Sequence, residues 1–301
     1  MNKELSYQDL KTRLEELSQQ YSELTYTYLG MSLLQKPIPL ITLGDREAKK
    51  SVLYVATHHP LENVCTSVLV SFIQDYLRSY RDFRQLYSIN LRYLYKMRKI
   101  YIIPMLNPDG VEYRLNGIDK LNPLYQRVIK YNGGSDDLSQ WNANARGVDL
   151  NHNYNAGFEE YKIIERERCI LPGCGKYSGE FAESEPEVSA LCNFVRINEG
   201  ELQGVISLHS QGEEIYYTSG SKCPKKSTHL AQIASRLTAY KLSTPQETAC
   251  YGGLTDWLIK EMDMPALTLE CGLGKNPLPP NTQRDIYLRL KELLFTFPIL
   301  F

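Results

Sequence analysis

Two histidines and a glutamate occur where their side chains could hold a metal ion. His59 ends the apolar run VLYVATHH, and Glu62 follows three residues later at the predicted start of a helix, so both side chains can turn toward one point above a sheet edge. His209 ends a second apolar run, GVISLH. Two histidines and one glutamate leave the fourth position of a zinc ion open to water, which is typical of catalytic rather than structural zinc sites. We therefore predict one Zn²⁺ on His59, Glu62 and His209.

His58 directly precedes His59, so the sequence offers two histidines for one position. Successive side chains of a strand point to opposite faces, and only one of the two can join the cluster. We select His59 because of its spacing to Glu62. An H-x-x-E pattern also arises by chance, and the alternative is a surface histidine followed by a glutamate that the dipole of a helix N-terminus favours.

Glu270 follows the apolar segment PALTL and ends a strand of the buried type. A carboxylate in such a place is costly unless it is paired, solvated or close to a cation. Beside a zinc ion it can take a proton from water that attacks a carbonyl and then pass the proton to the leaving amine. Glu270 is therefore the predicted catalytic base, and the alternative is a structural ion pair.

The elements that must position these residues alternate along the chain. Buried strands are predicted at 39–44, 52–59, 100–107, 204–211 and 265–272. Helical patterns occupy 62–80, 184–197, 226–240 and 281–296, and Ser184 with Glu187 forms a possible capping box. This order predicts one α/β domain, residues 1–301, with a mixed, mostly parallel central sheet covered by helices on both faces. Residues 111–180 are rich in Asn, Gly and Tyr, and we expect long loops there that build the site.

The composition favours a small substrate over a polymer or a membrane. There are 34 Lys and Arg against 35 Asp and Glu, so the net charge of -1 gives no broad reason to bind nucleic acid or anionic lipid. No apolar run reaches the roughly 18 to 20 residues that span a bilayer. Residues 1–20 have the pattern of a charged amphipathic helix and not of a secretory signal, so we expect a cytoplasmic protein with reduced cysteines. The oligomeric state does not follow from these patterns.

Six motifs, taken in their order and spacing, resemble a known family. They are HHPLE, IIPMLNPDG, RGVDLNHNYNAGF, SLHSQGEEIYY, YGGLTDW and TLECG. The set is similar to the zinc carboxypeptidases of the carboxypeptidase A type, and the resemblance extends over most of the chain. It implies the fold of that family, peptide hydrolysis, zinc on His59, Glu62 and His209, and Glu270 as the base. Two histidines and a glutamate are also the ligands of carboxypeptidase A itself.

Three details resemble one bacterial branch of the family. These are the run SQGEEIYY, the run GLGKNPLP and a histidine, His152, in DLNHN. The branch includes the γ-D-glutamyl-meso-diaminopimelate peptidases, which cut peptidoglycan stem peptides, so the resemblance implies a muropeptide substrate with contacts around Asn151. One alternative is a metallocarboxypeptidase for ordinary α-linked peptides. Another, from a different class, is a non-catalytic peptide-binding protein with the same fold.

His152 stands where digestive members of the family have an arginine that grips the terminal carboxylate of the substrate in a bidentate manner. A histidine pairs more weakly and depends on pH. The change suits a terminal residue that carries an extra amino and an extra carboxyl group, as diaminopimelate does. The alternative is a loop histidine without a role.

Other family positions also differ, and we predict replacements for them. Asn142 stands at the position of the arginine that stabilises the oxyanion, and Arg146 is the candidate to take over its role. Thr248 stands at the position of the mobile tyrosine, and Tyr251 could reach the substrate from the same loop. Gln211, two residues after His209, is predicted to hydrogen-bond the peptide backbone. For Arg146 and Tyr251, a surface arginine and a packed aromatic residue are equally simple interpretations.

Overall fold

A computed structural model describes residues 3–245 and 247–301 and shows an eight-stranded mixed sheet. The four central strands run parallel, whereas the pairs β1/β2, β2/β6 and β10/β8 are antiparallel. In sheet order the strands are β1 (Leu24–Met31), β2 (Pro37–Leu43), β6 (Arg98–Ile103), β3 (Lys50–Ala56), β7 (Leu202–His209), β10 (Ala266–Glu270), β8 (Glu214–Tyr216) and β9 (Lys241–Leu242). The predicted α/β fold with a mixed, mostly parallel sheet is confirmed.

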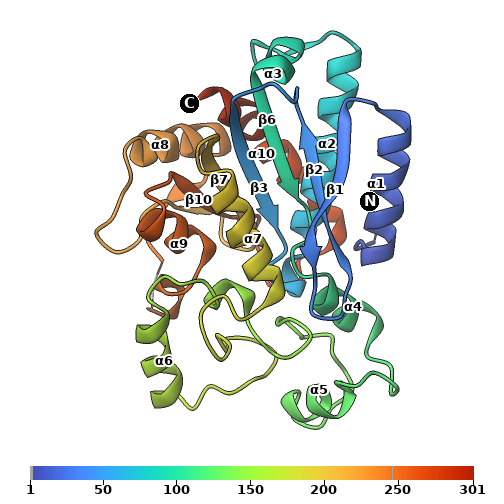
Figure 1. The fold of residues 1–301 in the computed structure, drawn as a ribbon, viewed down its shortest axis with the longest axis vertical. Coiled ribbons are helices and arrows are strands. Elements are labelled where there is room, and N and C mark those ends of the chain that lie inside the picture. Colours follow the sequence, from blue (N-terminus) through green and yellow to red (C-terminus); the bar gives the residue numbers. More distant parts are fainter. Residues whose placement is uncertain (1–2, 246) are drawn as a thin grey trace.

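Helices cover both faces of this sheet (Figure 1). One face packs against α1 (Tyr7–Gln20), α2 (Val64–Arg81), α3 (Leu91–Met97), α8 (Ser227–Thr238) and α10 (Gln283–Thr296). The other face packs against α7 (Pro186–Ile197) and α9 (Leu254–Glu261). Within the described residues, no helix is long and apolar enough to cross a bilayer. The cytoplasmic location stays a prediction.

Strand β3 shows why the central segments are apolar throughout. Val52 and Tyr54 belong to the core under α2 and α10, while Leu53 and Val55 belong to the core under α7 and α9. Because alternate side chains enter two different cores, a strand in the middle of this sheet has no polar face. The continuous apolar runs that predicted the strands are the direct result.

The carboxyl ends of the central strands meet at one edge, which collects the residues singled out above. β7 ends at His209 and β10 at Glu270, and these two residues are register partners in the parallel pair. β3 ends at Ala56, next to Leu208 of β7, and the chain continues directly to His59. Side chains that are far apart in the sequence are therefore neighbours at this edge.

The segment 111–180 contains more structure than predicted and lies beyond the strand ends (Figure 1). It includes most of α4 (Pro108–Asn116), α5 (Tyr125–Tyr131), a 3-10 turn (Leu150–His152) and α6 (Phe158–Glu167). A small third core around Trp141 holds part of it together. The expectation of loops was wrong for these helices, which are short and are supported by tertiary contacts more than by their own periodicity.

The predicted capping box at the start of α7 was also wrong. The N-cap residue is Glu185, which makes no capping hydrogen bond with its side chain. The Ser184 hydroxyl donates to Glu185, and the Glu187 carboxylate accepts from the backbone N–H of Leu33 instead. Both partners of the expected box are therefore engaged elsewhere.

Candidate active site

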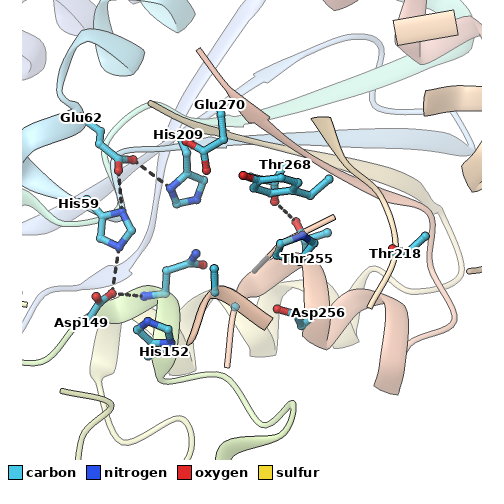
Figure 2. A pocket seen from close by; sticks show the side chains of 15 residues that line it. His59, Glu62, Asp149, His152, His209, Thr218, Thr255, Asp256, Thr268 and Glu270 are labelled. Atoms are coloured by element: carbon cyan, nitrogen blue, oxygen red, sulfur yellow. Dashed lines mark hydrogen bonds and ion pairs between the residues drawn. The ribbon is translucent and has the colours of Figure 1, made fainter. Parts of the chain in front are cut away.

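The three predicted metal ligands lie together at the sheet edge. Their ligand atoms are all within 4.8 Å of one another. Glu62 Oε1 is 3.0 Å from Nδ1 of His59, and Glu62 Oε2 is 2.9 Å from Nδ1 of His209 (Figure 2). His59 is extended, and a single 3-10 turn follows it, which brings Glu62 back beside it. The short spacing in the sequence thus becomes a cluster.

The chemistry of this donor set fits a zinc ion. At Zn–N distances of about 2.0 to 2.1 Å, tetrahedral ligand atoms are separated by about 3.3 Å, close to the separations above. Burial opposes ionisation of Glu62, but His59 and His209 hold the pKa of its carboxyl at about 2, so it carries a negative charge. His58 is not part of the set, because its Nε2 atom lies 2.8 Å from the Tyr154 hydroxyl.

A fourth residue, Asp149, supports the cluster and was missed in the sequence. Its Oδ1 atom lies 2.9 Å from Nε2 of His59, on the side of the ring opposite to Glu62. Burial alone would raise the pKa of Asp149, but His59, His152 and hydrogen bonds hold it well below its usual range. Histidines that bind metals commonly donate their second N–H to a carboxylate, which fixes the ring. The only local signal was its place in RGVDLNHN.

Glu270 lies beside the cluster and is partly buried. Burial, together with Glu62 and Glu214, raises the pKa of its carboxyl to about 7, although His209 and His59 act in the opposite direction. Within the described chain it has no Lys or Arg partner, so the alternative of a structural ion pair lacks a cation. A carboxyl with a pKa near neutrality is suited to accept and to return a proton.

The three metal ligands, Asp149 and Glu270 all line one cavity of about 150 Å³. Figure 2 shows the metal cluster and Glu270 at one side, with Thr218, Thr255 and Asp256 at the other. Apart from Pro245 and Ala249, its lining is polar, aromatic or glycine. The full lining is His59, Glu62, Asp149, Asn151, His152, His209, Tyr216, Thr218, Pro245, Ala249, Gly253, Thr255, Asp256, Thr268 and Glu270.

Asn151 and His152, two of the predicted substrate contacts, belong to this lining. Asn151 Oδ1 accepts a hydrogen bond from the backbone N–H of Leu254. His152 stacks on Tyr161 with ring centroids 4.2 Å apart, and its Nδ1 atom lies 2.8 Å from the carbonyl oxygen of Tyr251. A carbonyl only accepts, so Nδ1 carries the proton and Nε2 is left for another partner.

The structure does not bring Arg146, Gln211 or Tyr251 into this cavity. Arg146 forms a two-pronged ion pair with the buried carboxylate of Glu185 and lines a separate cavity with Tyr177. Gln211 is exposed beyond the end of β7. Arg146 lies away from the cavity because its charge partner is Glu185, the N-cap residue of α7, which no local pattern indicates.

Thr268 and Asp256, on the far side of the cavity, were not assigned to the site from the sequence. Thr268 and Thr255 share a hydrogen bond of 2.6 Å between their hydroxyls. Asp256 is buried, which raises the pKa of its carboxyl, and it accepts a hydrogen bond from the Ser219 hydroxyl. Thr268 stands two residues before Glu270 on the same strand. Because residues two apart in a strand point to the same face, this spacing could have identified Thr268 from the sequence.

Comparison with known proteins agrees with this geometry. The profile of the zinc carboxypeptidase family matches residues 10–287, so the chain belongs to that family and is a zinc-dependent peptide hydrolase. Among curated relatives, the γ-D-glutamyl-L-diamino acid endopeptidase 1 of Lysinibacillus sphaericus is 31% identical over 281 residues, 93% of this chain and 69% of the relative. Carboxypeptidase B2 of Mus musculus is 25% identical over 235 residues, 76% of this chain and 51% of the relative.

A solved structure shows the same fold. Thrombin activatable fibrinolysis inhibitor has a TM-score of 0.74 at 20% identity, and the match covers 97% of this chain and 73% of that one. The alternative of a fold without catalytic residues finds no support in the site, because the metal cluster and Glu270 are all in place.

Proposed function

We propose that the protein hydrolyses the bond between a γ-D-glutamyl residue and a diamino acid, such as meso-diaminopimelate, in peptidoglycan stem peptides. The observation that carries this proposal is the polar cavity beside the metal cluster. Of its described lining residues, none is Leu, Ile, Val, Phe or Met, so a large apolar side chain has no matching surface there. The activity in the name of the Lysinibacillus relative supports the same substrate class.

The reaction we propose begins with the metal ligands. His59 and His209 offer Nδ1 atoms and Glu62 offers its carboxylate, while Asp149 fixes the ring of His59. When bound, zinc supplies Lewis-acid polarisation of the scissile carbonyl and acidifies water. These residues hold their geometry before substrate arrives, because all of them are buried or nearly so.

Glu270 moves the proton in this proposal. Its carboxylate takes a proton from the attacking water as the new C–O bond forms at the scissile carbonyl carbon. It then passes that proton to the nitrogen as the C–N bond breaks, so the products are a carboxylate and an amine. A carboxyl with a pKa near 7 can perform both steps near neutral pH.

The leaving residue is recognised by the cavity that adjoins Glu270. The Asn151 amide and the free Nε2 of His152 lie where they can bind the carboxylate at the end of the substrate. The hydroxyls of Thr218 and Thr255 suit a side chain that carries amino and carboxyl groups. We assign no substrate contact to Arg146, Gln211 or Tyr251, since they lie outside this cavity.

The same cavity argues against ordinary α-linked peptides as the preferred substrates. An arginine clamp on the terminal carboxylate would be expected for those, and the described lining contains neither Arg nor Lys. His152 is its only basic side chain outside the metal cluster. The terminal grip is therefore weaker, and more of the recognition rests on the side chain of the leaving residue.

The test compares two peptides with the zinc-loaded protein. One is L-Ala-γ-D-Glu-meso-diaminopimelate and the other is its α-linked counterpart, with Glu270→Gln as the inactive control. We expect mass spectrometry to show release of diaminopimelate from the first peptide only, and no release by the variant. Cleavage of the α-linked peptide alone would overturn the substrate and keep the mechanism, whereas release that persists in Glu270→Gln would overturn the mechanism.

A further inference from the structure

Strand β8 places two polar side chains directly beside the catalytic strand β10. In the antiparallel register, Glu214 is opposite Glu270 and Tyr216 is opposite Thr268. Directly opposed residues share one face of a sheet, with Cβ atoms about 4.5 to 5.5 Å apart. Tyr216, Thr268 and Glu270 all line the cavity, so Glu214 adjoins its wall at the level of Glu270.

Glu214 and Tyr216 are linked, and the residues that the structure describes leave most of their acceptor capacity unused. The Tyr216 hydroxyl donates to Glu214 Oε2 at 2.8 Å. Burial, with Glu214 next, raises the pKa of this hydroxyl, so it stays a neutral donor. Among the described residues, the Glu214 side chain has no second hydrogen-bond donor and no Lys or Arg partner. Its Oε1 atom and the lone pairs of the Tyr216 oxygen are available to a ligand.

The pair of Glu214 and Glu270 is unusual as a structural feature. Like charges directly opposite each other on a sheet destabilise it. Within the described chain, neither carboxylate forms an ion pair with a Lys or Arg, and the histidines of the metal cluster offset the charge of Glu270 but not that of Glu214. A cationic group of a ligand placed next to Glu214 would relieve this repulsion.

Asp256 is the other carboxylate that could receive a cation, but its oxygens are already occupied. The Ser219 hydroxyl donates to Oδ1, and the backbone N–H of Gly253 also hydrogen-bonds this carboxyl. Asp256 is also largely buried, with a relative exposure of 6%. Glu214 is half-buried, and among the described residues its Oε1 atom accepts no hydrogen bond, so it is the better site for a cation.

We propose that Glu214 and Tyr216 bind the side-chain ammonium group of the leaving diamino acid and thereby select it over residues with uncharged side chains. This inference rests on the proposed function and names the residues behind its substrate class. An ammonium group has three N–H donors and no acceptor, and it meets two oxygens here, Glu214 Oε1 and the Tyr216 hydroxyl. Both hydrogen bonds are charge-assisted, and the one to Glu214 is the stronger because it joins two opposite charges.

The experiment uses three γ-linked peptides that differ only in the leaving residue. These residues are meso-diaminopimelate, L-lysine, which keeps the ammonium, and L-2-aminopimelate, which keeps the second carboxylate but lacks the ammonium. We expect Glu214→Gln to lower kcat/KM about tenfold to hundredfold for the first two, and to leave the third within about twofold. Tyr216→Phe should give a smaller loss, about two- to tenfold, with the same selectivity.

The matched control is Glu213→Gln, which removes the same charge from the neighbouring residue and should leave all three rates unchanged. An equal loss for all three peptides in Glu214→Gln, or no loss at all, would overturn the ammonium site. Circular dichroism melting curves show whether each variant is folded.

A binding measurement separates this inference from the proposed function. Titration calorimetry with free L-lysine, meso-diaminopimelate and L-2-aminopimelate does not require any peptide to be cleaved. We expect wild type to bind the first two more tightly, and Glu214→Gln to lose that preference. If wild type cleaves none of the peptides, the proposed function fails. A preference of wild type for the two ligands with a side-chain ammonium would still support the ammonium site. If wild type shows no such preference, the ammonium site is overturned.

Discussion

The Nε2 atom of His59 lies 2.9 Å from Oδ1 of Asp149, a residue 90 positions later in the chain. Asp149 is itself fixed, because it accepts hydrogen bonds from the backbone N–H groups of Asn151 and Lys176, each at 3.1 Å. One carboxylate therefore links the loop between β3 and α2, which carries His59, to the loop that lines the substrate cavity. We expect the orientation of the His59 ring to depend on this link.

We expect Asp149→Asn to weaken zinc binding about tenfold to hundredfold, which is the usual cost when a supporting carboxylate is removed from a metal-bound histidine. The substitution keeps the size of the side chain but removes the charge that stabilises the His59 N–H. Competition with a chromogenic chelator measures the affinity. Asp137→Asn, at an exposed position, is the control. An unchanged affinity would mean that Asp149 does not orient His59.

We expect Glu270→Gln to lower kcat about 10²- to 10⁴-fold while the protein keeps its zinc. The amide has the size of the carboxyl but cannot accept a proton, and Glu270 is not among the three metal ligands. Kinetics and metal analysis on the same preparation separate the two effects. A variant that loses its zinc would show that Glu270 maintains the metal site, contrary to the role proposed here.

His152→Ala tests the terminal grip. We expect KM to rise about tenfold for peptides with a free terminal carboxylate, because one hydrogen bond to a charged group is lost. A substrate whose terminal carboxylate is amidated provides the comparison, and its KM should not change. Equal effects on both substrates would show that the stacking of His152 on Tyr161 matters more than its ring nitrogen.

The sequence was sufficient for the metal cluster because its geometry is mainly local. The turn from His59 to Glu62 spans three residues, and His209 and Glu270 stand at strand ends that a parallel sheet must bring together. The central strands and the long helices were predictable for the same reason, since each carries a complete apolar pattern. Strands β8 and β9, with three and two residues, are too short for any such pattern.

The rest of the site depends on long-range pairing that no periodicity encodes. Arg146 is close in the sequence to Asp149 and Asn151, which line the cavity. The carboxylate of Glu185, 39 residues later, nevertheless holds its guanidinium group outside the cavity. Asp149 reaches His59 from the segment between α4 and α7, part of which packs around the small third core. Thr248 was predicted at the position of the mobile tyrosine, and its side chain lies outside the described residues.

Glu187 provides a test of stability that does not involve the metal site. It is fully buried in α7, where one carboxylate oxygen accepts from the backbone N–H of Leu33 and the other has no partner among the described residues. Burial raises its pKa from 4.5 to about 7, to which Asp109 and Glu185 contribute. A carboxyl whose pKa is higher in the folded state favours folding at low pH. This contribution is complete below pH 4.5 and is lost as the pH rises toward and through 7.

The difference between about 7 and 4.5 corresponds to at most about 3 kcal/mol of unfolding free energy. We therefore expect Glu187→Gln to be more stable than wild type at pH 8.5. Its unfolding free energy should also fall less than that of wild type between about pH 5 and 8, because the amide cannot ionise. The amide oxygen can still accept the hydrogen bond from the backbone N–H of Leu33. Urea unfolding of both proteins at several pH values measures the difference, and Glu199→Gln at the exposed end of the same segment is the control. Other groups also titrate in this range, so the quantity to compare is the difference in unfolding free energy between variant and wild type at each pH. If that difference is the same at pH 5 and pH 8.5, Glu187 does not change its ionisation on folding.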